Sequence, residues 1–132
     1  MFIDTSVIVA ILANESDAAA FATKLAERGR CLTSGLVILE ASMRLSSLLN
    51  VDPRAAELRI LQMLEAANIS VVPIDADIAS KAVAALATFG KGCGHPAQLD
   101  LADCMAYACA QAHRAPLLFK GNDFSHTDIQ VA

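Results

Sequence analysis

The chain has 132 residues, of which 55% are hydrophobic and 18% are charged, and its formal net charge is −4. This length and apolar content suffice for one compact core, so we expect a single domain spanning residues 1–132. The acidic balance argues against a protein that binds nucleic acid through a basic patch. It does not exclude an enzyme that meets phosphates through bound cations.

The cysteines, histidines and apolar runs argue against further classes of protein. The four cysteines and three histidines show neither CxxC nor HxxxH spacing, which argues against a zinc site and favours buried free thiols in a reducing cytoplasm. No apolar run is long enough to cross a bilayer, and the run at 7–13 lacks the preceding Lys or Arg of a signal peptide. We therefore expect a soluble, cytoplasmic protein with no membrane partner.

Short strands and helices alternate along the chain. A strand at Phe2–Ile3 leads into a helix to about Leu12, and a second helix begins near 14–17 and ends at Gly29. The later elements are expected as a strand at 31–33, a helix capped by Ser34, a helix starting at Asp52-Pro53, a strand at 69–72, a helix from Asp75 to Phe89, a loop at 90–96, a helix from about Asp100 to His113, and a strand at 117–119. Helical crossovers require parallel strands, which predicts a three-layer α/β/α domain with a central parallel sheet of four or five strands.

Apolar spacing also predicts which side of the two middle helices faces the core. In the helix after Ser34 the inward residues are Val37, Ile38, Ala41, Leu45 and Leu48. In the helix after Pro53 they are Ala55, Leu58, Leu61 and Leu64.

Four carboxylates far apart in the sequence follow predicted strands or begin predicted helices: Asp4, Glu40, Asp103 and Asp123. Functional groups of an open parallel sheet gather at the carboxyl ends of its strands, so we expect these side chains to converge. Like charges at such a site raise each other's pKa and need a cation, and hard oxygen ligands select Mg²⁺ or Mn²⁺. Two such ions about 4 Å apart can activate a water and grip a phosphodiester.

Each carboxylate also has a purely structural explanation, and the sequence leaves both open. Asp4 and Asp100 are favoured helix caps, and Asp103 is an acid favoured by the helix dipole in the first turn. Glu40 fits a solvated helical acid, and Asp123 fits a turn residue.

Four segments carry a family resemblance: MFIDTSVIVAIL, GLVILEAS, GKGCGHPAQLDLADCMAYACA and PLLFKGNDFSHTDI. Together they resemble the PIN-domain ribonucleases, and more narrowly the VapC toxins of type II toxin–antitoxin systems, from Met1 to about Ile129. The resemblance implies a PIN-like fold and Mg²⁺-dependent hydrolysis of phosphodiester bonds in structured cellular RNA. It also implies a VapB-type antitoxin, whose C-terminal segment fills the cleft, and a homodimer.

The resemblance further implies that four acids bind the metal and catalyse cleavage. Asp4 and Asp103 would anchor the principal metal, and Glu40 would hold or orient the attacking water. Asp123 would complete the shell or a second metal site, with Asp128 as the reserve candidate.

Other positions near these acids have expected roles of their own. Ser6 matches a small hydroxyl residue that touches a ligand water or a phosphate, whereas Asp100 is expected to cap its helix. Ala102 and Asp100 depart from the glycine and asparagine that many relatives have there. The candidates for phosphate contacts are Lys91, Arg114 and Lys120, each with a solvated surface role as the alternative.

Three rival functions remain open to the sequence. A phosphoacceptor receiver domain needs an acidic pair at the first strand, and a haloacid-dehalogenase-type phosphatase needs DxD where this chain reads Asp4-Thr5-Ser6. A catalytically silent PIN module would only bind partners. The retention of four self-repelling acids favours the nuclease over the silent module.

Overall fold

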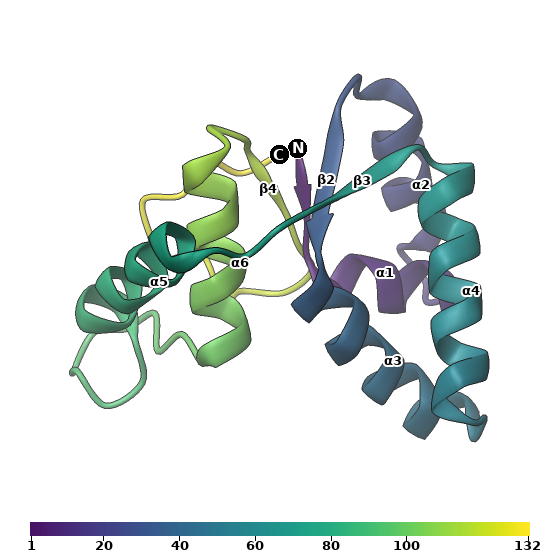
Figure 1. Ribbon diagram of the computed structural model, residues 1–132, viewed down its shortest axis with the longest axis horizontal. Coiled ribbons are helices and arrows are strands. Elements are labelled where there is room, and N and C mark those ends of the chain that lie inside the picture. Colours follow the sequence, from purple (N-terminus) through teal and green to yellow (C-terminus); the bar gives the residue numbers. More distant parts are fainter.

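Four short strands form one parallel sheet at the centre of the computed structural model, which describes residues 1–132 (Figure 1). They are β1 (Phe2–Ile3), β2 (Cys31–Ser34), β3 (Ile69–Val72) and β4 (Leu117–Leu118), in the order β3-β2-β1-β4. Phe2 of β1 is in register with Leu32 of β2 and with Leu117 of β4. The predicted parallel sheet is confirmed, with four strands.

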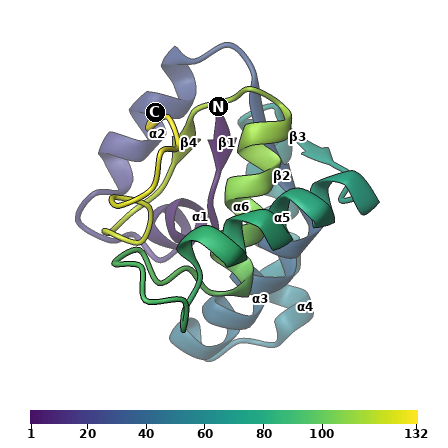
Figure 2. The same cartoon turned by 90° about the vertical axis from the view of Figure 1, so that its left-hand side faces the viewer.

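Six helices cover the two faces of the sheet. They are α1 (Thr5–Leu12), α2 (Ala18–Glu27), α3 (Gly35–Leu49), α4 (Pro53–Ala66), α5 (Ala76–Phe89) and α6 (Leu101–Ala112). Helices α5 and α6 pack together on one side, and Figure 2 shows them in front of the strands. Helices α1 to α4 lie on the other side (Figure 1), so the predicted three-layer α/β/α architecture is confirmed. None of the six helices is long and apolar enough to span a lipid bilayer.

Side-chain caps fix where several helices begin. The Ser34 hydroxyl accepts a hydrogen bond from the Val37 N–H at 3.4 Å, and Asp75 accepts one from Ile78 at 2.9 Å. Asp52 caps α4 through the Arg54 N–H at 2.8 Å, with proline in the first turn. These bonds satisfy N–H groups that have no partner within the helix, which is why the predicted helix starts are confirmed.

The core is aliphatic and centred on β1. Phe2 and Ile3 are fully buried, and α6 buries the middle and last part of its length, from Cys104 to Ala110, because it is packed between the sheet and α5. Its small residues at 106, 108 and 110 allow this close approach. The four cysteines are free; three are buried as expected, but Cys93 is exposed in the loop after α5.

The predicted inward faces of α3 and α4 need correction. In α3, Leu45 is fully buried, but Leu48 is 60% exposed. In α4 the buried side chains are Ala56, Ile60 and Leu64, whereas Ala55, Leu58 and Leu61 face solvent. Both helices carry more apolar residues than one face can hold, so packing between α3 and α4, rather than spacing, selects the buried stripe.

Two leucines of α3 test this correction. We expect Leu45→Ala to lower the free energy of unfolding by about 2–5 kcal/mol, because it leaves a cavity in a packed core. Leu48→Ala is the matched control and should change it by less than about 0.5 kcal/mol. Urea denaturation followed by circular dichroism measures both. Equal losses would show that Leu48 is buried after all.

Candidate active site

Asp4 lies where β1 ends and α1 begins. Its backbone N–H donates to the Leu118 carbonyl at 3.0 Å, which extends the pairing of β1 with β4 by one residue. Its Oδ2 accepts hydrogen bonds from the Ser6 N–H at 3.1 Å and from the Ser6 hydroxyl at 2.6 Å, so Asp4 caps α1. Burial raises the pKa of Asp4, the Ser6 hydrogen bonds oppose that shift, and the nearby Asp123 charge adds to it.

Asp103 lies in the first turn of α6 and forms a reciprocal capping box with Asp100. The Asp100 Oδ1 accepts from the Asp103 N–H at 2.9 Å, and the Asp103 Oδ2 accepts from the Asp100 N–H at 3.1 Å. The predicted capping role of Asp100 is therefore confirmed. Burial raises the pKa of Asp103 to about 7, and the charges of Asp100 and Asp123 add to the shift.

Asp123 lies in the loop that follows β4, residues 119–124, which we call the post-β4 loop. Its carboxylate opposes the ionisation of both Asp4 and Asp103, so one electrostatic neighbourhood contains all three acids. We call Asp4, Asp103 and Asp123 the acid cluster. The ion pairs of the structure involve only Lys81 and Lys120, and neither lysine pairs with the acid cluster.

Glu40 is placed at the margin of this cluster. It is half-buried on α3 and lines a shallow groove together with Asp100 and Leu101 at the start of α6. It is not among the charges that shift the pKa of Asp4 or Asp103. The structure thus brings Glu40 to the same side of the molecule but not into the acid cluster.

The donor set suits a hard cation, although it does not form a closed cage. No three carboxylate, histidine or cysteine side chains lie close enough together to hold one ion. Mg²⁺ does not need such a cage, because it usually keeps several waters and is bound through one or two carboxylates. Buried, oxygen-only groups with raised pKa values and no paired cation fit that kind of ion.

Ser6 and Lys120 contact other protein groups, whereas the expectation from the sequence is that Ser6 touches a ligand water or phosphate and that Lys120 is a candidate for a phosphate contact. The Ser6 hydroxyl donates to Asp4 and accepts from the Lys120 backbone N–H at 2.9 Å, so it links Asp4 to the post-β4 loop. The Lys120 ammonium pairs with Glu15 and, at 3.2 Å, with Asp17. Sequence reasoning missed this link, and no local pattern marks it, because Lys120 and Glu15 are 105 positions apart.

The remaining candidates lie outside the acid cluster. Asp128 accepts a hydrogen bond from the Tyr107 hydroxyl. Burial, helped by this contact, raises the pKa of Tyr107 to about 12. Lys91 lines a groove between α5 and α6. Arg114 follows the C-terminal end of α6 and precedes β4, which places it at the opposite end of the sheet from Asp4.

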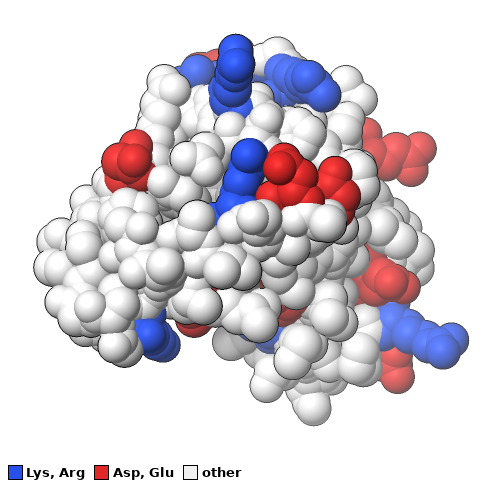
Figure 3. Space-filling model, turned by 60° about the vertical axis from the view of Figure 1, so that its left-hand side comes forward, with Lys and Arg blue, Asp and Glu red and all other residues white.

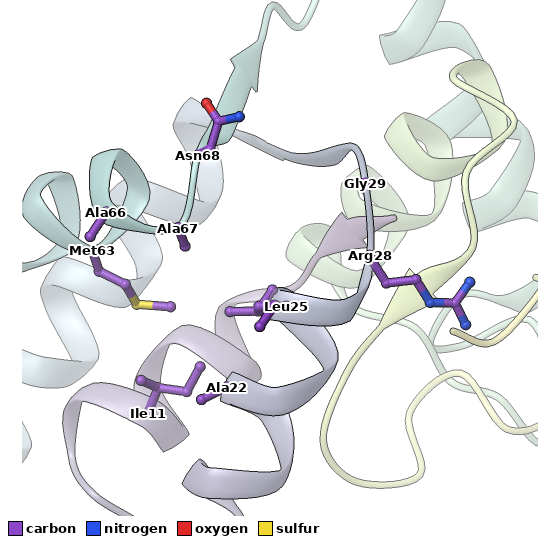
Figure 4. Close-up of a pocket in the computed structure, with 10 residues that line it drawn as sticks. Ile11, Ala22, Leu25, Arg28, Gly29, Met63, Ala66, Ala67 and Asn68 are labelled. Atoms are coloured by element: carbon purple, nitrogen blue, oxygen red, sulfur yellow. The ribbon is translucent and has the colours of Figure 1, made fainter.

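On the face shown in Figure 3, several lysine and arginine side chains lie along the top edge, and the rest are scattered over a mainly uncharged surface. The pocket shown in Figure 4, of about 510 Å³, lies among α1, α2 and α4. Ile11, Leu25 and Met63 line it and Arg28 extends at its rim, but it contains no carboxylate and is separate from the acid cluster.

Comparison with known proteins places this geometry in a family. The model of the PIN domain matches residues 1–130. Ribonuclease VapC28 of Mycobacterium tuberculosis is 44% identical over 132 residues, covering 100% of this chain and 97% of that protein. A VapC ribonuclease of Rhizobium meliloti is 38% identical over 139 residues, covering 97% of this chain and 98% of that protein.

Solved structures share the fold at lower identity. The Mycobacterium tuberculosis toxin VapC20, described as cleaving the sarcin–ricin loop, superposes with a TM-score of 0.77 at 16% identity, covering 99% of this chain and 97% of that one. A chain of a toxin–antitoxin complex from Klebsiella pneumoniae gives 0.73 at 21% identity, covering 99% and 95%. From the family match and the full-length identities, the chain belongs to the PIN-domain family and, within it, to the VapC ribonucleases.

Proposed function

We propose that this chain is a Mg²⁺-dependent endoribonuclease and the toxin of a type II toxin–antitoxin system, acting on structured cellular RNA. Its membership in the VapC ribonucleases supports the reaction class. The acid cluster, in which the Asp123 charge opposes the ionisation of Asp4 and Asp103 and no cation pairs with any of the three, is the observation that carries the site assignment.

Asp4 and Asp103 hold the principal metal in this proposal, and Asp123 completes the shell or a second site. When bound, Mg²⁺ or its substitute Mn²⁺ supplies the positive charge that grips a phosphodiester and stabilises the leaving oxygen. Ser6 fixes the orientation of the Asp4 carboxylate through two hydrogen bonds. Glu40, from the margin of the cluster, orients the attacking water and takes its proton.

Two alternatives are less well supported. A silent binding module has no use for buried carboxylates whose ionisation opposes folding. A receiver domain lacks its acidic pair here, because Thr5 and Ser6 follow Asp4.

The homodimer uses an apolar surface on α3, α5 and α6. Leu39, Met43 and Leu101 border one groove, and Val83, Leu86 and Leu101 border the next, so Leu101 joins the two. All five side chains are at least 48% exposed, and Leu101 is 73% exposed. A monomer rarely leaves such a continuous apolar surface in water, and a second copy of the same surface covers it.

A VapB-type antitoxin is the second protein partner. In this proposal the C-terminal segment of the antitoxin fills the cleft at the acid cluster, as the relationship to the VapC ribonucleases implies. Free buried thiols at Cys31, Cys104 and Cys109 support a reducing, cytoplasmic location for the pair. Co-expression with the product of the neighbouring gene tests this assignment through suppression of RNA cleavage.

Asparagine substitutions test the metal ligands. We expect Asp4→Asn and Asp103→Asn each to lower RNA cleavage at least about 100-fold, because each removes a charge that holds the cation. EDTA should abolish wild-type cleavage and added Mg²⁺ should restore it. A gel assay on total cellular RNA measures these rates, with Asp77→Asn, an exposed acid on α5, as the control. Undiminished cleavage by both variants would remove the proposed roles.

The raised pKa of Asp103 predicts a pH effect on stability in metal-free buffer. Between the ordinary pKa of 3.8 and the folded value of about 7, the folded chain keeps a proton that the unfolded chain has lost. Wild-type stability therefore falls as pH rises through this range, and Asp103→Asn escapes the loss. The melting temperature of the variant, measured by scanning calorimetry, should rise relative to wild type between pH 5 and pH 8. A constant difference would contradict the raised pKa.

The dimer surface is tested by introducing charge. We expect the wild-type chain to elute at twice its chain mass, and Met43→Glu or Val83→Glu to elute as a monomer, because a buried unpaired carboxylate is costly. Leu58→Glu is the matched control, since Leu58 is 57% exposed on α4 and lies outside this surface. Size-exclusion chromatography with light scattering gives the masses. Dissociation by Leu58→Glu alone would place the interface elsewhere.

A further inference from the structure

The post-β4 loop carries Asp123 and is fixed to the N-terminal part of the chain at two points. At the first point, the Lys120 backbone N–H donates to the Ser6 hydroxyl at 2.9 Å. At the second, the Lys120 ammonium pairs with Glu15 and with Asp17, which lie between α1 and α2. We call these contacts of Lys120 the loop clamp.

Ser6 connects the loop clamp directly to the acid cluster. Its hydroxyl gives its only proton to the Asp4 Oδ2 at 2.6 Å while accepting from Lys120. One side chain therefore orients the Asp4 carboxylate and holds the loop that presents Asp123.

Between its two ends the loop is held by one turn, in which the Asn122 carbonyl accepts from the Ser125 N–H at 3.0 Å. Phe124 is 2% exposed and packs on the Phe119 ring, which fixes the far end of the loop. Gly121 has a φ of +99°, a conformation that only glycine adopts freely, and Asn122 and Asp123 are exposed. The location of the Asp123 carboxylate is thus set by Lys120 on one side and Phe124 on the other.

We propose that Lys120, with Glu15 and Asp17, is a positioning group that sets the separation of Asp123 from Asp4 and thereby the affinity for the divalent cation. This inference rests on the proposed function. It assigns Lys120 to the loop clamp rather than to the phosphate of the substrate, because its ammonium is already held by two carboxylates.

Because the loop clamp is an exposed set of ion pairs, its loss should affect metal affinity more than stability. Exposed ion pairs add little to overall stability, so breaking this one should leave the fold intact. Residues that contact metal ligands and fix their orientation, without binding the metal themselves, typically change the metal affinity by about 10–100-fold when they are mutated. The effect should therefore be seen in metal binding, not in melting temperature.

The test measures Mn²⁺ affinity by calorimetry on the full chain, together with the melting temperature in metal-free buffer. We expect Lys120→Met to weaken Mn²⁺ binding about tenfold, and the double variant Glu15→Gln, Asp17→Asn to weaken it by a similar factor. Combining all three substitutions should add little, since each breaks the same contact. Lys120→Arg should keep wild-type affinity because it retains the ion pairs, and Lys81→Met, which breaks the exposed ion pair with Asp77 outside the clamp, is the control.

Two other possible roles of Lys120 predict different changes in Mn²⁺ affinity and in the KM for RNA. If its charge acted only through its field, Lys120→Met would strengthen Mn²⁺ binding while the double acid variant weakened it. If Lys120 bound the RNA phosphate, Lys120→Met would raise the KM for RNA with Mn²⁺ affinity unchanged, and the double acid variant would lower the KM. Either pattern overturns the proposal. Wild-type protein that binds no Mn²⁺ would instead overturn the proposed function itself.

Discussion

The burial of Asp4 and Asp103 next to the charge of Asp123, at one end of the sheet, is the constraint on which the site depends. Asp4, Asp103 and Asp123 come from three separate segments, and Asp123 opposes the ionisation of the other two. No lysine or arginine pairs with them, and Lys120, the cation nearest to Asp123 in sequence, is engaged with Glu15 and Asp17. Keeping these unpaired carboxylates together costs free energy of folding. In return, a hard cation can bind among them without displacing an existing ion pair.

Helix capping stabilises the charged form of Asp4 and Asp103 in this arrangement. Asp4 caps α1 and Asp103 shares a capping box with Asp100, so each carboxylate accepts backbone N–H groups at the positive end of a helix dipole. The structural and the functional explanations of these acids are therefore compatible: the same hydrogen bonds that begin the helices hold the carboxylates in place. Asp100 fits the structural explanation alone, whereas Glu40 is placed beside the cluster and depends on the proposed water-orienting role for its function.

The acid cluster, the apolar surface and the pocket of Figure 4 lie at three different places on the molecule. The acid cluster lies at the carboxyl end of β1, the apolar surface of α3, α5 and α6 adjoins it through Glu40 and Asp100, and the pocket of Figure 4 lies among α1, α2 and α4. The pocket of Figure 4 is therefore separate from both the acid cluster and the apolar surface.

The sequence by itself determined the order of strands and helices, the parallel sheet, the helix caps and the candidate acids, because these depend on relations between residues a few positions apart. Only the tertiary structure decided that Leu48, Leu58 and Leu61 face solvent, since surplus apolar residues leave more than one possible buried face. It also decided that Lys120 is held by Glu15 and Asp17, and that Asp128 is bound to Tyr107. Such pairings join residues up to 105 positions apart, and packing of the sheet and its helices, not local pattern, brings them together.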